Sequence, residues 1–247
     1  MKALILAAGY GTRLYPLVTD TPKPLLLVAD KPLINHIVEK LPALPDLTEL
    51  IVVTNQKFEK TFLSWALQLE KKFPAAVRIV NDATTAPENR LGSVGDIDFV
   101  VKSLSLNEDL LVLGGDNLFD FSLEKFVAFG RAKKTAVSVG LYDIHNLKDA
   151  SIYGVVELGD DNSIKSFEEK PAMPKSTLIS MCCYYFPKST LAYLEEYKKS
   201  LGKMDKAGEY IHWLVQEKEV CGFKFFGKWY DIGSIESYKE AQEKFRT

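Results

Sequence analysis

Short, almost wholly aliphatic runs alternate with helix-like stretches in the first half of the chain, and this alternation constrains the fold most. Apolar runs without polar alternation are typical of strands buried on both faces, as in a parallel sheet. They lie at Lys2–Ala7, Leu50–Thr54, Val77–Val80 and Leu110–Leu113. Apolar residues recur at helical spacing in Leu33–Leu41, Phe58–Phe73 and Leu123–Phe129, the second of which carries Phe62, Leu63, Ala66 and Leu67. Strand–helix–strand alternation predicts βαβ units with right-handed crossovers.

The second half of the chain is richer in strands that are separated by turn residues. Strands are expected at Thr135–Tyr142, Gly154–Leu158, Ser163–Glu168, Leu178–Phe186, Val220–Phe226 and Trp229–Asp231. Helices are expected at Lys188–Ser200, at Tyr210–Val215 and from the cap Ser234 to Phe245. We therefore predict a single Rossmann-like, three-layer α/β domain over residues 1–247. Its mixed, mostly parallel sheet has helices on both faces and a more antiparallel half from residue 135 onward.

Composition excludes several classes of protein. The 247 residues can bury a sizeable core, and 31 Lys and Arg against 33 Asp and Glu give a net charge of −2. That balance predicts no nucleic-acid or membrane partner. The chain begins without the pattern of a signal peptide, and its cysteines, only Cys182, Cys183 and Cys221, do not suggest a disulfide framework. We expect a cytoplasmic protein, either a monomer or a homo-oligomer.

The first apolar run leads directly into a glycine loop. Gly9-x-Gly11 is followed by Thr12 and Arg13, and Lys23 comes in a Pro-Lys-Pro segment shortly after. Glycines let the backbone approach a ligand closely, and their amides can point at phosphate oxygens. Two nearby cations would strengthen such an anion site. The spacing fits neither a P-loop nor a dinucleotide fingerprint, so an ordinary strand–helix turn remains the alternative.

Two acidic residues follow apolar or aromatic strands. Asp116 comes after Gly114-Gly115, and Asp231 stands between an aromatic pair and Ile-Gly-Ser. Carboxylates at the ends of strands can hold Mg²⁺, which usually takes one or two of them together with substrate phosphates. The alternatives are a strand-end turn for Asp116 and a helix-start acid for Asp231. Asp120 is expected to cap the helix that follows it.

The opening string resembles the signature of the sugar-1-phosphate nucleotidylyltransferases, the family of glucose-1-phosphate thymidylyltransferase. It reads Ala7-Ala8-Gly9-x-Gly11-Thr12-Arg13-Leu14-x-Pro16-Leu17, then Pro22-Lys23-Pro24-Leu25. The resemblance implies a nucleotide half over residues 1–134 and a sugar-phosphate half over residues 135–247. It also implies that Mg²⁺ is the cofactor and that Asp116 and Asp231 hold it.

The resemblance also assigns the nucleotide-binding residues: Leu6, Ala8, Gly9, Gly11, Thr12, Arg13, Asn81 and Gly92. Relatives read the base with a Gln near the end of the third strand and with a Leu-Gly turn. Leu91-Gly92 matches the turn, but the Gln is missing, and Asn81 or Asp82 occupies its neighbourhood. The stretch Ala83–Arg90 looks inserted. The base is therefore left open among dTTP, UTP and CTP.

The sugar-phosphate segment of the family is matched by Tyr-Gly-Val-Val and, one hairpin later, Glu-Glu-Lys-Pro. The match assigns sugar hydroxyls to Gly154 and Glu169 and the sugar's phosphate to Lys170. Tyr184 keeps a position that lines the sugar pocket, whereas Cys182 stands where relatives have a small glycine. The identity of the sugar is therefore left open.

The resemblance implies an enzyme that makes an NDP-sugar and pyrophosphate from an NTP and a sugar-1-phosphate. Its catalytic residues would be Arg13, Lys23 and Asp116. Because the attacking phosphate oxygen is already anionic, no general base is needed, and catalysis would rest on positioning and electrostatics. Two alternatives are kept. One is a cytidylyltransferase for phosphocholine or a polyol phosphate, and the other is a non-catalytic regulatory module that binds a nucleotide sugar.

Overall fold

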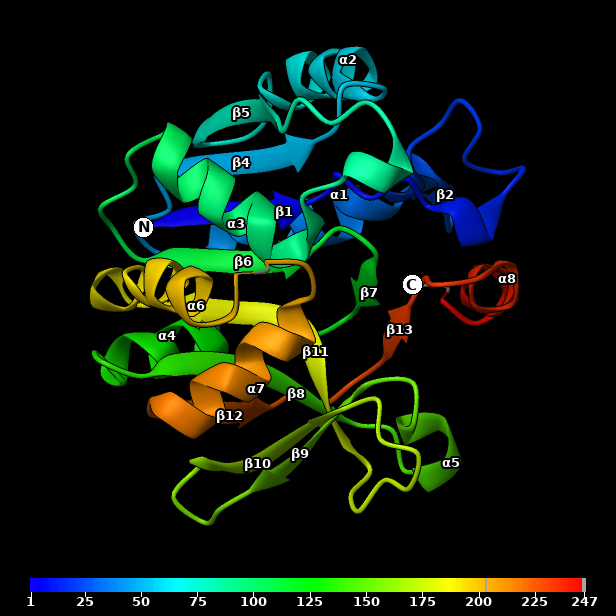
Figure 1. Ribbon diagram of the computed structural model, residues 1–247. Coiled ribbons are helices and arrows are strands. Elements are labelled where there is room, and N and C mark those ends of the chain that lie inside the picture. The colour runs from blue at the N-terminus through cyan, green and yellow to red at the C-terminus, as the bar shows by residue number, and fades with distance from the viewer. Residues whose placement is uncertain (203, 246–247) are drawn as a thin grey trace. The chain divides into compact units, whose positions relative to one another are not determined.

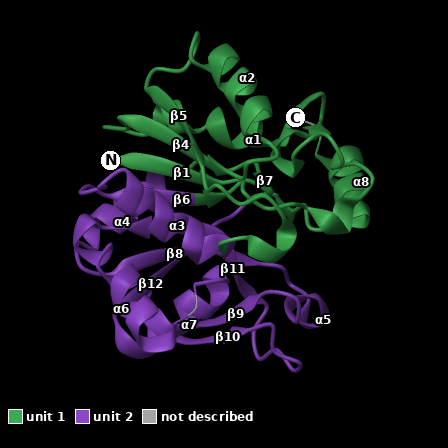
Figure 2. Cartoon of the chain, turned by 45° about the horizontal axis from the view of Figure 1, so that its top comes forward, with its two compact units in different colours: residues 1–91, 113–123, 227–247 green, residues 92–112, 124–226 purple. Residues whose placement is uncertain are grey.

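The computed structural model describes residues 1–202 and 204–245, which divide into two compact units (Figure 2). Unit 1 comprises Met1–Leu91, Leu113–Leu123 and Gly227–Thr247, and unit 2 comprises Gly92–Val112 and Glu124–Phe226. Both units therefore combine segments that are distant in the sequence. Across the described ranges, no helix has the length and apolar character that crossing a membrane demands.

Unit 1 is built on the parallel strands β1 (Lys2–Leu6), β4 (Glu49–Thr54) and β5 (Ala76–Asn81). Leu4 is opposite Ile51, and Val52 is opposite Ile79. The end of β6 (Leu110–Gly114) lies next to β1 in the strand order. Further elements are a short ribbon of β2 (Leu27–Val28) and β3 (Lys31–Pro32), with the helices α1 (Leu33–Val38), α2 (Glu59–Leu69) and α8 (Ile235–Lys244). Helix α2 packs against β5 (Figure 1).

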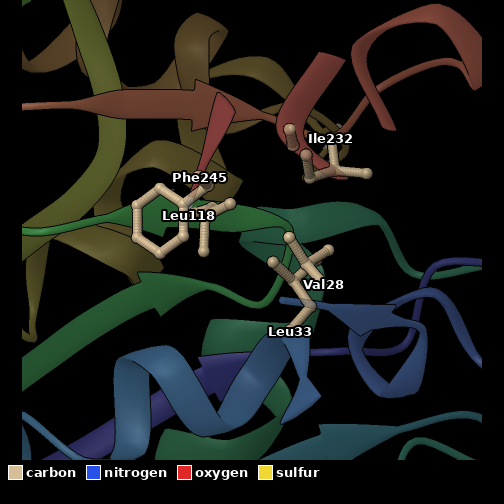
Figure 3. Close-up of a cluster of buried hydrophobic side chains, with 6 residues drawn as sticks. Val28, Leu33, Leu118, Ile232 and Phe245 are labelled. Carbon is tan, nitrogen blue, oxygen red and sulfur yellow. The ribbon is translucent and has the colours of Figure 1, made fainter. Parts of the chain in front are cut away.

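A second ribbon in unit 1 joins β7 (Asn117–Phe119) to β13 (Trp229–Asp231) in antiparallel pairing. A buried apolar cluster lies beside it and brings together β2, α1, β7, α8 and the residue that follows β13 (Figure 3). The cluster consists of Val28, Leu33, Leu118, Ile232, Ala241 and Phe245. The predicted cap of the last helix is confirmed, since the Ser234 hydroxyl accepts a hydrogen bond from the amide of Ser237.

Unit 2 carries the more antiparallel sheet. Its strands are β8 (Val137–Asp143), β9 (Gly154–Leu158), β10 (Ile164–Glu169), β11 (Leu178–Phe186) and β12 (Val220–Lys224). Strands β9 and β10 form a hairpin (Figure 1), β11 pairs antiparallel with β8 and β9, and β12 pairs parallel with β8. The predicted α/β class with a mixed sheet is confirmed.

The helices of unit 2 are α3 (Gly92–Ser103), α4 (Glu124–Ala132), α5 (Leu147–Ala150), α6 (Tyr193–Leu201) and α7 (Ala207–Glu217). Helix α4 packs on β8 and β11, and α7 packs on β10. At Gly130, a side chain would collide with the ring of Tyr185, so glycine allows α4 to approach the sheet closely.

Of the four apolar residues at helical spacing in α2, Phe62 and Ala66 are buried, whereas Leu63 and Leu67 are 46% and 64% exposed. Two local predictions were wrong. The range predicted as one helix from Lys188 is a 3₁₀ turn, Lys188–Thr190, followed by α6. Asp120 does not cap α4, because its carboxylate accepts a hydrogen bond from the amide of Lys228, 2.8 Å away.

Candidate functional site

Hydrogen bonds hold the glycine loop where it follows β1. The amide of Ala7 donates to the carbonyl of Val53, and the side-chain amide of Asn55 donates to the carbonyl of Ala8 at 2.8 Å. Gly11 has a φ of +63°, which favours glycine, and Thr12–Leu14 then forms a 3₁₀ turn. No atom lies within 4 Å of the position that a Cβ on Gly9 would take, so that face of the loop is open.

A cavity of about 380 Å³ lies against this loop. Its lining is Gly9, Tyr10, Gly11, Thr12, Arg13, Leu14, Lys23, Pro87, Arg90 and Gly233. Three cationic side chains therefore line one cavity. Arg13 is exposed, and within residues 1–202 and 204–245 its guanidinium has no hydrogen-bond or ion-pair partner. Open glycine backbone with cations around it suits a polyphosphate.

Lys23 and Asp116 form an ion pair beside this loop. The Lys23 Nζ lies 2.7 Å from Oδ2 of Asp116, whose side chain is 32% exposed. Burial alone would raise the pKa of Asp116, but the Lys23 ammonium outweighs it, with a further contribution from Arg13, and the pKa is lowered. The side-chain amide of Asn117 donates to Oδ1 at 3.2 Å. Asp116 is therefore a carboxylate at neutral pH.

Asp231 comes from near the C-terminal end of the sequence and lies near Asp116. It is opposite Asn117 in the β7–β13 ribbon, and the amide of Ile232 donates to the carbonyl of Asp116 at 3.0 Å. A Cβ built on Gly233 would lie 3.5 Å from Oδ2 of Asp231 and 4.0 Å from a terminal nitrogen of Arg13. The structure thus gathers Arg13, Lys23, Asp116 and Asp231 in one region of unit 1.

The donor chemistry of the two aspartates fits Mg²⁺, which prefers oxygen ligands. Among the described residues no group of three or more His, Cys, Asp and Glu side chains gathers in a metal-binding arrangement. An ion held by two carboxylates would complete its shell with water and substrate phosphates. Asp116 and Asp231 are the residues that would hold it.

Three of the residues assigned to the nucleotide are engaged in local structure. The side-chain amide of Asn81 donates to Gln56, and its oxygen accepts from the amide of Ala83. The carbonyl of Leu6 accepts from Gly115, and that of Ala8 from Asn55. Contacts of Leu6, Ala8 and Asn81 with a nucleotide stay predictions.

Gly92 belongs to unit 2 and begins α3. Its φ is +80°, and a Cβ there would lie 2.5 Å from the carbonyl oxygen of Asp205. The amides of Val94 and Gly95 donate to the carbonyls of Asp205 and Met204. One face of the Leu91-Gly92 turn is therefore covered by protein, and the assigned nucleotide contact of Gly92 stays a prediction.

The residues assigned to the sugar meet at the open end of the β9–β10 hairpin in unit 2. Gly154 is opposite Glu169, and the amide of Lys170 donates to the carbonyl of Tyr153 at 2.9 Å. A side chain at position 154 would overlap the ring of Phe167, so glycine is required there. The hairpin thus brings Gly154, Glu169 and Lys170 together.

Glu169 is half-buried and Tyr184 is buried in this region. Burial raises the pKa of Glu169 against the opposing charges of Lys170 and Lys206. Burial also raises the pKa of the Tyr184 hydroxyl well above its ordinary value, and the nearby Cys182 and Glu169 add to the shift. Among the described residues the Glu169 carboxylate has no hydrogen-bond partner. Such a carboxylate can accept ligand hydroxyls.

Comparison with known proteins agrees with this arrangement. The family described as "Nucleotidyl transferase" matches residues 2–247. The chain belongs to the nucleotidyl transferase family. This confirms the resemblance seen in the opening string and in the sugar-phosphate segment.

This nucleotidyl transferase has curated relatives that are longer than itself. It is 32% identical over 256 residues to the bifunctional protein GlmU of Methanocaldococcus jannaschii, covering all of this chain and 56% of that protein. It is 31% identical over 240 residues to the mannose-1-phosphate guanylyltransferase catalytic subunit beta of Drosophila melanogaster, covering 96% of this chain and 60% of that protein. The chain thus spans just over half the length of these relatives.

Solved structures share the fold. A putative glucose-1-phosphate thymidylyltransferase from Bacillus anthracis has a TM-score of 0.85 at 26% identity, covering 98% of this chain and 94% of that one. A UDP-glucose pyrophosphorylase, solved with UDP-glucose, has a TM-score of 0.82 at 24% identity, covering 99% of this chain and 97% of that one. The latter similarity shows the fold alone.

Sequence reasoning missed three features of the nucleotidyl transferase's unit 1 site. Arg90 and Pro87, from the stretch that looks inserted, line the cavity with Arg13. Asn117 orients the site by donating to Asp116 and accepting from the Trp229 indole at 2.7 Å. Arg90 could have been predicted, because it comes directly before the Leu91-Gly92 turn. The role of Asn117 could not, because nothing in the sequence pairs it with Trp229.

Proposed function

We propose that this nucleotidyl transferase makes an NDP-sugar and pyrophosphate from an NTP and a sugar-1-phosphate, in a Mg²⁺-dependent reaction. One observation carries the proposal. Arg13, Lys23, Asp116 and Asp231 gather in one region of unit 1, with Arg13 and Lys23 lining the glycine-loop cavity. Cations suited to phosphates and carboxylates suited to a divalent ion are what a reaction between two anions requires.

The reaction needs no proton transfer at the nucleophile. An oxygen of the sugar phosphate attacks the α-phosphorus in line, the bond to the β-phosphate oxygen breaks, and its electron pair leaves with pyrophosphate. We assign the departing pyrophosphate to Arg13 and to the amides of Gly9, Gly11 and Thr12. Lys23 neutralises charge at Asp116 and on the nucleotide phosphates. Mg²⁺, when bound by Asp116 and Asp231, supplies further neutralisation of phosphate charge.

The sugar-1-phosphate is assigned to unit 2. The amide of Gly154 and the carboxylate of Glu169 would bind sugar hydroxyls, Lys170 the phosphate, and Tyr184 the sugar ring. The unpartnered, half-buried Glu169 supports this assignment, because a hydroxyl donor would satisfy it. We keep dTTP, UTP and CTP as candidate nucleotides. A cytoplasmic setting fits Cys182, Cys183 and Cys221, which form no disulfide in the part of the chain that the structure describes.

A substrate matrix tests the proposal. Purified protein with Mg²⁺ is offered each NTP against a panel of hexose-1-phosphates, and pyrophosphate release is measured, with hexose-6-phosphates as matched controls. We expect release with at least one hexose-1-phosphate and none with the 6-phosphates. Turnover only with CTP and phosphocholine or a polyol phosphate would replace the sugar by that acceptor. Nucleotide-sugar binding without any turnover would point to a regulatory module.

A further inference from the structure

The first turn of α7 lies directly against the Glu169 carboxylate. Gly208 is the second residue of this helix. A Cβ built on Gly208 would overlap Oε2 of Glu169 and stand 2.5 Å from its Cδ and 3.1 Å from Oε1. Contacts this close are not tolerated, so any side chain at position 208 must displace the carboxylate or the helix.

The helix itself is held in place at this point. The amide of Ala207 donates to the Ser93 hydroxyl at 2.7 Å, and that hydroxyl donates to the carbonyl of Asp205 at 3.1 Å. The backbone of Gly92 also packs closely against Asp205. Because the start of α7 is bonded to α3, the flexible Glu169 side chain has to give way first.

Glycine is otherwise a poor choice at this position. It is disfavoured in helices relative to alanine, because it loses more backbone entropy on folding. The φ of Gly208 does not lie in the left-handed region, so conformation alone does not demand glycine. What demands it is the approach of Glu169, a carboxylate with no hydrogen-bond partner among the described residues.

We propose that Gly208 is a positioning residue for the sugar-phosphate site, since its missing side chain leaves the space in which the Glu169 carboxylate is held ready for sugar hydroxyls. This inference rests on the proposed function. Lys206, the residue before α7, forms an ion pair with Glu209 at 3.0 Å. Charges of both signs therefore lie near the Glu169 carboxylate. Gly208 acts through Glu169 and touches no substrate itself.

Gly208→Ala tests the inference in steady-state kinetics. We expect the KM for the sugar-1-phosphate to rise roughly tenfold or more, because a sugar hydroxyl loses its hydrogen bond to the charged Glu169. The KM for the NTP should change less than about twofold. The unfolding temperature of Gly208→Ala should stay close to that of the wild type, because alanine favours the helix. Gln216→Ala, on the exposed last turn of α7, is the matched control and should change neither KM.

A double-mutant comparison decides whether the effect passes through Glu169. In a Glu169→Ala background the space is vacant, so adding Gly208→Ala should change the sugar KM less than about twofold. An unchanged sugar KM in Gly208→Ala alone, or an equal rise in the Glu169→Ala background, would overturn the inference. Wild-type protein that turns over no hexose-1-phosphate would instead overturn the proposed function.

Discussion

Lys23 lowers the pKa of Asp116. The carboxylate is two-thirds buried, which works against ionisation, and the ammonium 2.7 Å away reverses that effect. The same pair sets the local charge near the glycine loop, where Arg13 adds a second cation. We therefore expect removal of Lys23 to raise the pKa of Asp116 and to weaken phosphate binding.

We predict that Lys23→Met moves the acid limb of the pH–rate profile to higher pH. With Lys23 present, the pKa of Asp116 lies below its ordinary value, so the carboxylate stays ionised as the pH falls. Without Lys23 the effect of burial remains and raises the pKa, and protonation removes activity at a higher pH. The measurement is kcat/KM against pH for both proteins. Lys31→Met, which breaks an exposed pair with Glu39, is the control. An unmoved acid limb in Lys23→Met would refute the assignment.

At the scale of elements, the β7–β13 ribbon joins the two aspartates. Its strands are short, and β7 was not foreseen, because Gly114-Gly115-Asp116-Asn117 has the composition of a turn and a three-residue strand shows no periodicity. The longer apolar strands were predicted almost to the residue, since burial on both faces leaves a continuous apolar run.

Leu118 should therefore matter for both stability and activity. It is fully buried in the cluster of Figure 3, and its strand carries the residue paired with Asp231. We expect Leu118→Ala to lower the free energy of unfolding by about 2–5 kcal/mol and to reduce turnover. Leu67→Ala, at a site 64% exposed, should stay within about 0.5 kcal/mol. Urea titration followed by circular dichroism measures both, and equal effects of the two substitutions would contradict the role given to the ribbon.

At the scale of the molecule, the sequence predicted the ingredients of the site better than their assembly. The glycine loop and Asp116 follow strands, and Asp231 and Glu169 are the last residues of strands, so these positions can be located from local patterns. The division into two units built from separated segments could not be located in this way, because it depends on contacts between distant residues. The contact of Met204 and Asp205 with the start of α3 also joins residues that are distant in the sequence, so local patterns could not predict it.

Chelation distinguishes a catalytic ion from a structural one. We expect EDTA to abolish pyrophosphate release and added Mg²⁺ to restore it. Thermal unfolding should barely change, because Asp116 already has Lys23 as its counter-charge in the folded protein. Turnover that survives exhaustive chelation would show that the two aspartates serve another purpose.

The central claim is that the glycine loop and its arginine hold the phosphates on which the chemistry occurs. Arg13 is exposed, so its loss should leave the fold intact. The most direct measurement is kcat for pyrophosphate release by Arg13→Ala, beside Lys60→Ala on the exposed surface of α2 and with thermal unfolding of each. The account predicts a loss of ~10²–10³ in kcat for Arg13→Ala at an unchanged unfolding temperature, and none for Lys60→Ala. Turnover by Arg13→Ala close to that of the wild type would contradict it.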